Sequence, residues 1–253
     1  MCTVVIEVPT EARDAIRILA VRDEDPARAW DPPGPWWPER FPGVIGVRDR
    51  RAGGAWLAAQ PASGRLAVLL NRAAEVPEPA AGFRSRGELP LAAVEGGAPS
   101  DPPGTPAFTL VSLGPDGAET VSWDGSALRR QRLAPGVHMV DHREVDDPAS
   151  PRIARWLPVF RAAAGAPAEG WRARWLRILA ESAALGPEDE RAIVRDNTPH
   201  GYPTQSLLVC TAEAGGVTAP GPPRVSLHWA ALARPGRWDD PAFTRALPAP
   251  GGP

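Results

Sequence analysis

The chain has 253 residues, of which 43% are hydrophobic and 23% are charged, and its net charge is −2. These values are typical of a globular protein long enough to bury a sizeable core. They show neither the basic stripe of a nucleic-acid-binding protein nor an apolar run of about 20 residues, so we expect no nucleic-acid partner and no stable membrane insertion. All 28 basic residues are Arg, which excludes Schiff-base, pyridoxal-anchoring and Walker-type chemistry that needs Lys.

The chain has few residues that bind metals or form disulfides. Two cysteines, Cys2 and Cys210, and four histidines cannot build a disulfide framework, and neither C-x-x-C nor H-E-x-x-H spacing occurs. We therefore expect no metal site and no cofactor. The N-terminal stretch MCTVVIEVP has neither a positive leader nor a long apolar core, which predicts a cytoplasmic protein. The composition leaves the oligomeric state open.

The N-terminal part of the chain predicts short strands joined by turns. A β-branched run opens the chain, and a second apolar run leads into Arg22-Asp23-Glu24, which is typical of a hairpin-like pair of strands. Gly53-Gly54 indicates another turn. The expected strands are residues 2–8, 17–21, 44–47, 55–59 and 65–71.

Six prolines lie between residues 26 and 42. They exclude a helix and a central strand, so this segment is expected to be a loop or flap. Its adjacent indoles, Trp36 and Trp37, favour an ordered segment because exposed paired indoles are costly.

The rest of the chain predicts strands, then helices, then strands. A short helix interrupted by Pro90 is expected first, followed by a Gly/Pro-rich linker at residues 95–106. The absence of a regular βαβ alternation favours α+β layers. The linker could mark a boundary, but we favour one domain over residues 1–235 with a Pro/Gly-rich tail at 236–253. The later expected elements are the helix 85–94, strands 108–113, 119–123, 127–133 and 136–140, helices around 153–160 and 171–179, and strands 204–211 and 224–232.

Five motifs occur in a fixed order along the first part of the chain. They are Met1-Cys2-Thr3, Arg22-Asp23-Glu24, Gly53-Gly54-Ala55-Trp56-Leu57, Gly64-Arg65-Leu66-Ala67 running into Asn71, and Ser85-Arg86-Gly87. In this order the chain resembles the NRDE family, the transport and Golgi organisation two-like proteins, over about residues 1–235. The resemblance implies the four-layer αββα sandwich of the N-terminal-nucleophile hydrolases, and similarity to their cysteine branch, which cleaves linear amides.

The resemblance implies a reactive cysteine at the start of the chain. Removal of Met1 would leave Cys2 with both a thiol and a free α-amino group, whose reference pKa of about 7.7–8.0 lets it accept the thiol proton. Arg22 is expected beside the sulfur, where its charge lowers the pKa of the thiol. Asp23 would hold the α-ammonium group or orient the substrate, and Asn71 would donate its amide to a developing oxyanion.

Two functions follow from the resemblance. The first is a cysteine hydrolase of a small-molecule amide or acyl thioester. The alternative is a non-catalytic protein that binds or traffics a hydrophobic ligand, haem or an acyl lipid, beneath a flap formed by Trp30, Trp36 and Trp37. The simpler interpretation of these indoles is a loop packed on the core.

Simpler interpretations also exist for the proposed site residues. Cys2 could be incidental, Arg22-Asp23-Glu24 could be a solvated strand end or a local ion pair, and Asn71 could cap a turn. Cys210 lies in an apolar run and is expected to be an inert buried thiol.

The sequence also departs from the family pattern. Val21 stands where the name-giving motif has Asn, and Ala55 replaces Thr. Asp141-His142 and the stretch around Pro203 replace segments that carry Asn or Arg in relatives. Because losing one oxyanion donor typically lowers the rate by about 10²–10³, the sequence is compatible with either a divergent enzyme or a binding protein that has lost activity.

Overall fold

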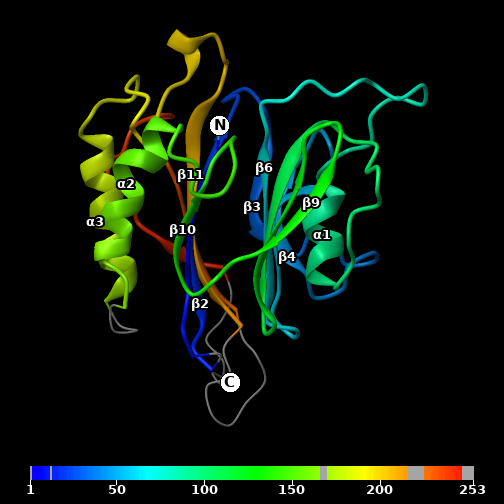
Figure 1. Ribbon diagram of the computed structural model, residues 1–253, viewed down its shortest axis with the longest axis horizontal. Helices are drawn as coiled ribbons and strands as arrows, with labels where there is room; N and C mark the ends of the chain where they lie inside the picture. Colours follow the sequence, from blue (N-terminus) through cyan, green and yellow to red (C-terminus); the bar gives the residue numbers. More distant parts are fainter. Residues whose placement is uncertain (1, 12, 166–169, 216–224, 247–253) are drawn as a thin grey trace.

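The protein is a sandwich of two antiparallel sheets covered by helices. The computed structural model describes residues 2–11, 13–165, 170–215 and 225–246. Figure 1 shows four layers in the order helices α2 and α3, a first sheet, a second sheet and helix α1. This arrangement confirms the expected α+β, four-layer αββα architecture.

The elements follow one another in the predicted order. The helices are α1 (Glu88–Val94), α2 (Pro151–Ala162) and α3 (Trp171–Ala183), with a 3-10 turn at Thr198–His200. The strands are β1 (Thr3–Val8), β2 (Ile16–Glu24), β3 (Trp30–Gly34), β4 (Ile45–Asp49), β5 (Ala55–Gln60), β6 (Arg65–Asn71), β7 (Phe108–Gly114), β8 (Gly117–Trp123), β9 (Leu128–Arg132), β10 (Gly136–Val140), β11 (Gln205–Ala214), β12 (Ser226–Ala231) and β13 (Thr244–Arg245).

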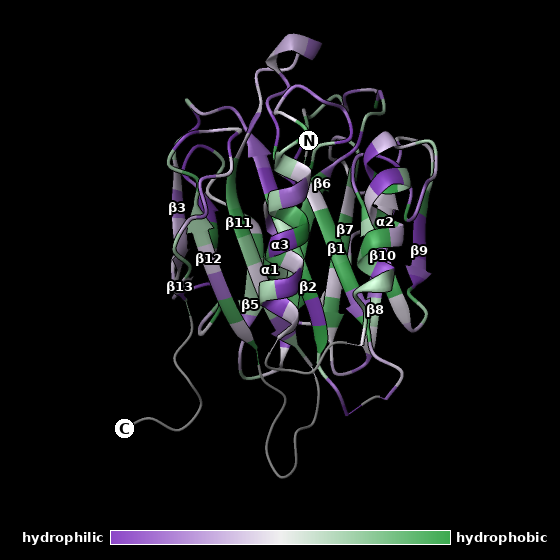
Figure 2. Cartoon of the chain, turned by 90° about the vertical axis from the view of Figure 1, so that its left-hand side faces the viewer, coloured by the Kyte–Doolittle hydropathy of each residue, from purple (hydrophilic) through white to green (hydrophobic). Residues whose placement is uncertain are grey.

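The first sheet has the strand order β10-β1-β2-β11-β12-β13, so the first strand of the chain lies between two others. The hairpin predicted from the two apolar runs is confirmed: β1 and β2 pair antiparallel, with Thr3 opposite Val21. Strand β11 joins β2 on its other side. Because these strands are covered on both faces, β1 and β11 are apolar along most of their length (Figure 2).

The second sheet has the strand order β3-β4-β5-β6-β7-β8-β9, so every neighbour along the chain is also a neighbour in space. The inner faces of the two sheets form one apolar core, in which Val4 and Ile6 from β1 pack with Leu57 and Val68 from the second sheet. Alternate residues of β1 therefore face this core, and the others face the helices.

Helices α2 and α3 cover the outer face of the first sheet. Helix α2 begins where the Ser150 hydroxyl accepts a hydrogen bond from the Ile153 amide, and Pro151 occupies its first turn. The two helices bury aromatic side chains together, with the rings of Phe160 and Trp175 in an edge-to-face contact at 5.4 Å. In the part of the chain that the structure describes, no helix is both long and apolar enough to cross a bilayer.

Three predicted segments differ from expectation in detail. The Pro-rich segment contains a strand, β3, but β3 lies at the sheet edge, where proline removes no ladder bond. Pro90 does not interrupt the short helix, because it lies in the first turn of α1, where its missing N–H is not needed. Within the expected tail, β13 pairs with β12. The boundary at residue 235 stays a prediction.

Candidate functional site

A pocket of about 650 Å³ opens where β1 begins and where β2 and β6 end. In Figure 1 these ends lie together at the top of the sandwich, above the shared core. The pocket is lined from both sheets and from the segment that leads into α1. Its lining residues include Cys2, Arg22, Asp23, Glu24, Arg28, Asp49, Arg51, Trp56, Asn71, Arg84 and Arg86.

Cys2 reaches this pocket from the inner face of the first sheet. Its side chain is 6% exposed, and its sulfur accepts a hydrogen bond from the Asp23 amide at 3.4 Å. Burial raises the pKa of the Cys2 thiol, the charge of Asp23 adds to this effect, and the positive charge of Arg22 opposes it. Burial outweighs the effect of Arg22.

Arg22 lies in the same pocket, one strand from the cysteine. Its side chain is 3% exposed, and its Nη2 atom is 3.4 Å from Glu24 Oε2. Its Nη1 atom is buried and has no hydrogen-bond partner among the described residues. A buried guanidinium nitrogen without a partner is costly, so it is available to a ligand or to a charge that forms on the sulfur.

Asp23 uses its backbone and its side chain for different contacts. The amide N–H faces the sulfur of Cys2, whereas the carboxylate accepts hydrogen bonds from the Ser206 hydroxyl at 2.6 Å and from the Asn197 amide at 3.4 Å. Ser206 and Asn197 were not predicted, because the pairing that brings them to β2 is long-range.

Asn71 ends β6 and lines the pocket, and its side chain is exposed. The structure thus brings Cys2, Arg22 and Asn71 to one pocket, together with the backbone of Asp23. The catalytic roles of the four residues remain proposals.

A charged network that sequence reasoning missed continues from this point. Arg28 Nε lies 2.5 Å from Asp49 Oδ2 and 3.8 Å from Glu24 Oε2, so it joins the end of β2 to the end of β4. Burial is the largest single effect on the pKa of Asp49, and it raises this pKa. Hydrogen bonds from backbone amides and from the Arg28 side chain together outweigh burial, so the pKa of Asp49 is lowered. Arg86 also lines the pocket. The motif Ser85-Arg86-Gly87 was recognised in the sequence, but nothing in it indicated where Arg86 points.

The tryptophans of the Pro-rich segment lie outside the pocket lining. Trp37 donates its Nε1 hydrogen to the Gly53 carbonyl at 2.7 Å, and Trp36 donates to Pro32 at 2.8 Å while Arg48 lies over its ring. Both pack with the cluster beneath α1. The structure therefore supports a loop packed on the core.

Two of the departures from the family pattern, Val21 and Asp141, lie outside the pocket, whereas Ala55 lines it. Val21 faces α2 and α3 in the outer core. Asp141 is buried, and it accepts hydrogen bonds from the Ser150 hydroxyl at 2.5 Å and from the Arg143 amide at 2.9 Å. Asp141 thus fixes the start of α2. Cys210 is 1% exposed, and burial raises the pKa of its thiol, as expected for an inert core cysteine.

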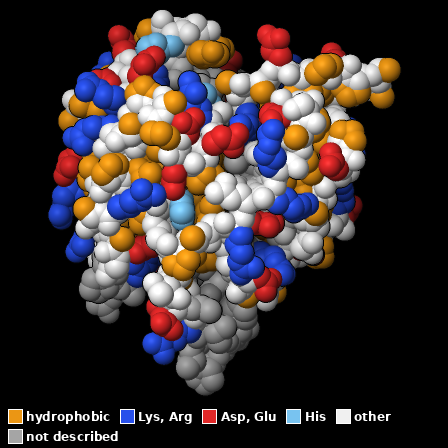
Figure 3. Space-filling view, viewed as in Figure 1, with side chains coloured by type: hydrophobic (Ala, Val, Ile, Leu, Met, Phe, Trp, Pro, Cys, Tyr) orange, Lys and Arg blue, Asp and Glu red, His pale blue; other side chains and the backbone are white. Residues whose placement is uncertain are grey.

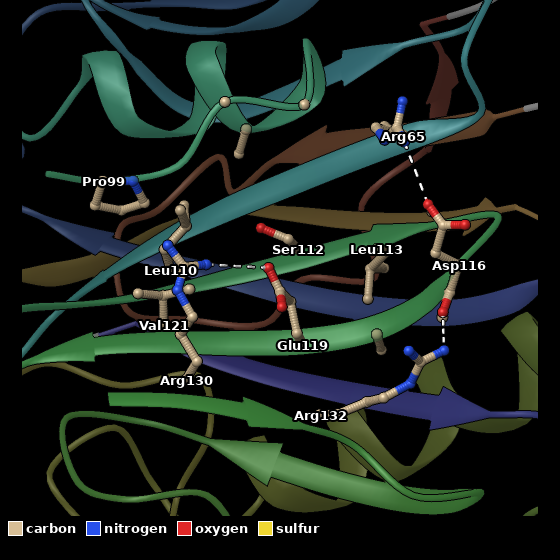
Figure 4. Close-up of a pocket in the computed structure, with 16 residues that line it drawn as sticks. Arg65, Pro99, Leu110, Ser112, Leu113, Asp116, Glu119, Val121, Arg130 and Arg132 are labelled. Carbon is tan, nitrogen blue, oxygen red and sulfur yellow. Dashed lines mark hydrogen bonds and ion pairs between the residues drawn. The ribbon is translucent and has the colours of Figure 1, made fainter. Parts of the chain in front are cut away.

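A second pocket, of about 260 Å³, lies on the second sheet near α1 (Figure 4). Its arginines are already engaged: Arg65 with Asp116 at 3.3 Å, Arg130 with Glu119 at 3.7 Å, and Arg132 with the Asp116 carbonyl. No Cys or His is among its lining residues. Figure 3 shows the same mixing of basic and acidic side chains across the face that it presents. No group of three metal-ligating side chains occurs among the described residues.

The fold and the pocket define a four-layer α+β protein with a cysteine at the open end of its core. The sequence model of the family described as Transport and Golgi organisation 2 matches residues 1–105, which confirms the resemblance over the part that forms β1 to β6 and α1. A comparison with curated proteins finds no match. One similar solved structure is the Caenorhabditis elegans ortholog of N-acylethanolamine-hydrolyzing acid amidase, with 10% identity, a TM-score of 0.38 and coverage of 83% of this chain and 92% of that chain.

Proposed function

We propose that this protein is a cysteine hydrolase that cleaves an amide or an acyl thioester of a small molecule, with Cys2 as the nucleophile. The observation that supports this most directly is the position of Cys2 in the wall of a pocket of about 650 Å³ that is also lined by Arg22 and Asn71. A pocket of this size is within the range of small-molecule sites.

The proposed reaction has two stages. Once Met1 has been removed, the α-amino group of Cys2 takes the thiol proton, and the sulfur attacks the carbonyl carbon to form a tetrahedral oxyanion. The Asn71 amide donates to that oxygen. The bond to nitrogen or sulfur breaks, and the leaving group takes the proton from the α-ammonium. Water then attacks the thioester, which releases a carboxylic acid and restores the thiol.

The environment of Cys2 favours proton removal during attack rather than a standing thiolate. Burial raises the pKa of the thiol despite Arg22, so the resting form at neutral pH is protonated. A base beside the sulfur is therefore required, and an α-amine on the same residue supplies one. The unpartnered Nη1 of Arg22 would then stabilise the negative charge that develops.

The experiment combines mass spectrometry with thiol labelling. Intact mass should show loss of Met1. Peptide mapping after brief iodoacetamide treatment should show faster alkylation of Cys2 than of Cys210, because Cys2 lines a pocket and Cys210 is 1% exposed in the apolar core. Retention of Met1, or equal labelling of the two thiols, would refute the catalytic role.

Activity provides the second arm of this test. Hydrolysis of amide and thioester substrates should be lost in Cys2→Ala and kept in Cys210→Ala, which is the matched control because it removes the other thiol. Loss of activity in both variants, with both folded, would show that a core defect rather than a missing nucleophile was measured.

The family alternative, binding or trafficking of haem or an acyl lipid, has less support. The pocket is lined by five arginines and three acidic residues, and Trp36 and Trp37 pack elsewhere. A haem titration that gave a saturable Soret change would favour this alternative. We also propose a single domain over residues 1–235 and a cytoplasmic location. The two free cysteines support the location, because reducing compartments keep thiols unpaired.

A further inference from the structure

In the Cys2 pocket the acidic side chains have partners, whereas several of the arginines have no carboxylate partner in the described part of the chain. Its acidic side chains are all engaged: Asp23 by Ser206, Glu24 by Arg22, and Asp49 by Arg28. By contrast, Arg51, Arg84 and Arg86 line the pocket without an ion pair within 4 Å to any carboxylate of the described residues. The pocket therefore has positive charge that the protein itself does not neutralise.

Arg86 is the most constrained of these three arginines. Its Nη1 donates to the Ala107 carbonyl at 2.7 Å, and its side chain is partly buried, whereas Arg51 and Arg84 are exposed. Burial lowers the pKa of Arg86, and the groups that also act on it include Glu24 and Cys2. Arg86 and Cys2 line the same pocket.

A close contact between two glycines fixes the backbone next to Arg86. The Ala55 amide donates to the Gly87 carbonyl at 2.7 Å, and a Cβ on Gly87 would lie 2.8 Å from Gly54 Cα. Only glycine permits this approach. The Gly-Gly turn and the Ser-Arg-Gly motif, which are separate in the sequence, therefore form one unit that holds Arg86 against the pocket.

The buried Nη1 of Arg22 is a second, independent indication of a ligand. It is a charged donor without a partner among the described residues, in a side chain that is 3% exposed and lines the same pocket. Such donors are rarely left unsatisfied in a working site. Within the part of the chain that the structure describes, donors that lack an acceptor are therefore present both at the rim of the pocket and in its wall, where Arg22 lies.

We propose that the substrate carries an anionic group, a carboxylate or a phosphate, and that Arg86 binds this group while the scissile carbonyl lies at Cys2. Arg51 and Arg84 would add long-range attraction at the rim. This inference rests on the proposed function, since it assigns the substrate class of the same site. Arginine suits either anion, because its planar guanidinium can donate two parallel hydrogen bonds.

The test compares short-chain probes that share an octanoyl amide and differ in the group attached to its nitrogen. N-octanoylglycine carries a carboxylate, N-octanoylphosphoethanolamine carries a phosphate, and N-octanoylglycinamide is neutral. We expect kcat/KM to be about 10- to 100-fold higher for at least one anionic probe than for the neutral one, which is the range of a charged hydrogen bond. The preferred anionic probe identifies the anion.

The substitution Arg86→Gln should remove most of that preference while changing the neutral probe little. Arg130→Gln is the matched control, because Arg130 is an exposed arginine of the other pocket and is paired with Glu119. Equal kcat/KM for charged and neutral probes in the unsubstituted protein would overturn the inference, even if the Arg86 variant failed to fold. Equal losses for all three probes in a folded Arg86→Gln variant would overturn it as well.

Binding to the Cys2→Ala variant separates this inference from the proposed function. If the unsubstituted protein hydrolyses none of the probes but Cys2→Ala binds an anionic probe in calorimetry, and Arg86→Gln abolishes that binding, the anion site stands and the hydrolase proposal fails. If hydrolysis depends on Cys2 but not on probe charge, the hydrolase stands and the anion site fails.

Discussion

Replacing Gly87 with Ala tests the glycine contact that fixes the pocket rim. The backbone at Gly87 has φ −66° and ψ −11°, which an alanine adopts without strain, so the substitution carries no conformational penalty. The new Cβ, however, would lie 2.8 Å from Gly54 Cα and 3.1 Å from the Gly54 carbonyl carbon. Both are backbone atoms and cannot rotate away, so the two segments must separate.

The expected cost is that of overpacking a tight contact, about 1–3 kcal/mol of unfolding free energy. The Ala55–Gly87 hydrogen bond, 2.7 Å long in the structure, would stretch at the same time. For a domain of this size the loss corresponds to a fall in Tm of about 2–4 °C per kcal/mol. Because Arg86 precedes Gly87, the preference for anionic probes should also fall.

Urea unfolding and thermal melting measure this effect, with Gly170→Ala as the control. Gly170 has φ −123°, and a Cβ there would meet nothing within 4 Å, so its substitution should change stability by no more than about 0.5 kcal/mol. If Gly87→Ala were as stable as Gly170→Ala, the two segments would not be in the contact described, and the placement of Arg86 would lose its physical basis.

Two further predictions concern the first sheet. Burial, followed by repulsion from Arg172 and Arg245, lowers the pKa of His228 to about 4, so the unfolded chain binds more protons than the folded one between that value and about pH 6.5. The free energy of unfolding should therefore fall by about 1–2 kcal/mol when the pH is lowered through this window, a value that already allows for solvent screening of the partly exposed ring. Urea midpoints measured across this pH range should change less in His228→Gln than in the unsubstituted protein. Ser206→Ala removes the hydroxyl that donates to Asp23 at 2.6 Å and accepts from the Arg195 amide at 3.0 Å. This substitution should lower the free energy of unfolding by about 1–3 kcal/mol. An unchanged urea midpoint would show that water replaces both bonds.

Much of the architecture could be predicted because the signals are local. Short apolar runs predicted the strands of both sheets except β3 and β13, and helical spacing predicted α2 and α3. Both signals are local, because a buried face leaves a periodic pattern of apolar residues in the sequence. Which strands become neighbours depends on tertiary contacts. Strand β11 pairs with β2 across most of the chain, and that pairing alone brings Ser206 to Asp23.

The same distinction divides the candidate site. Cys2 and Arg22 could be predicted together because they belong to one hairpin, in which a short connection makes the strands adjacent. Arg86 could not be assigned a place, because its position depends on the contact between Gly54 and Gly87, which no local pattern encodes. The sequence indicated that the charge of Arg22 lowers the pKa of Cys2, but it did not indicate the burial that raises this pKa further than Arg22 lowers it.

The position of Cys2 links these observations. The inner faces of the two sheets form an apolar core that runs along β1 and reaches Cys2, and beyond it the lining changes to arginines and carboxylates. The thiol thus lies at the boundary, where burial keeps it protonated and the charged pocket gives it access to a ligand. An anionic substrate bound at Arg86 would complete the lining and exclude water from the sulfur. Proton transfer to the α-amine and attack on the carbonyl would then occur in a site with a lower effective dielectric constant. There the charge of Arg22 would stabilise the developing negative charge more strongly than in the open pocket.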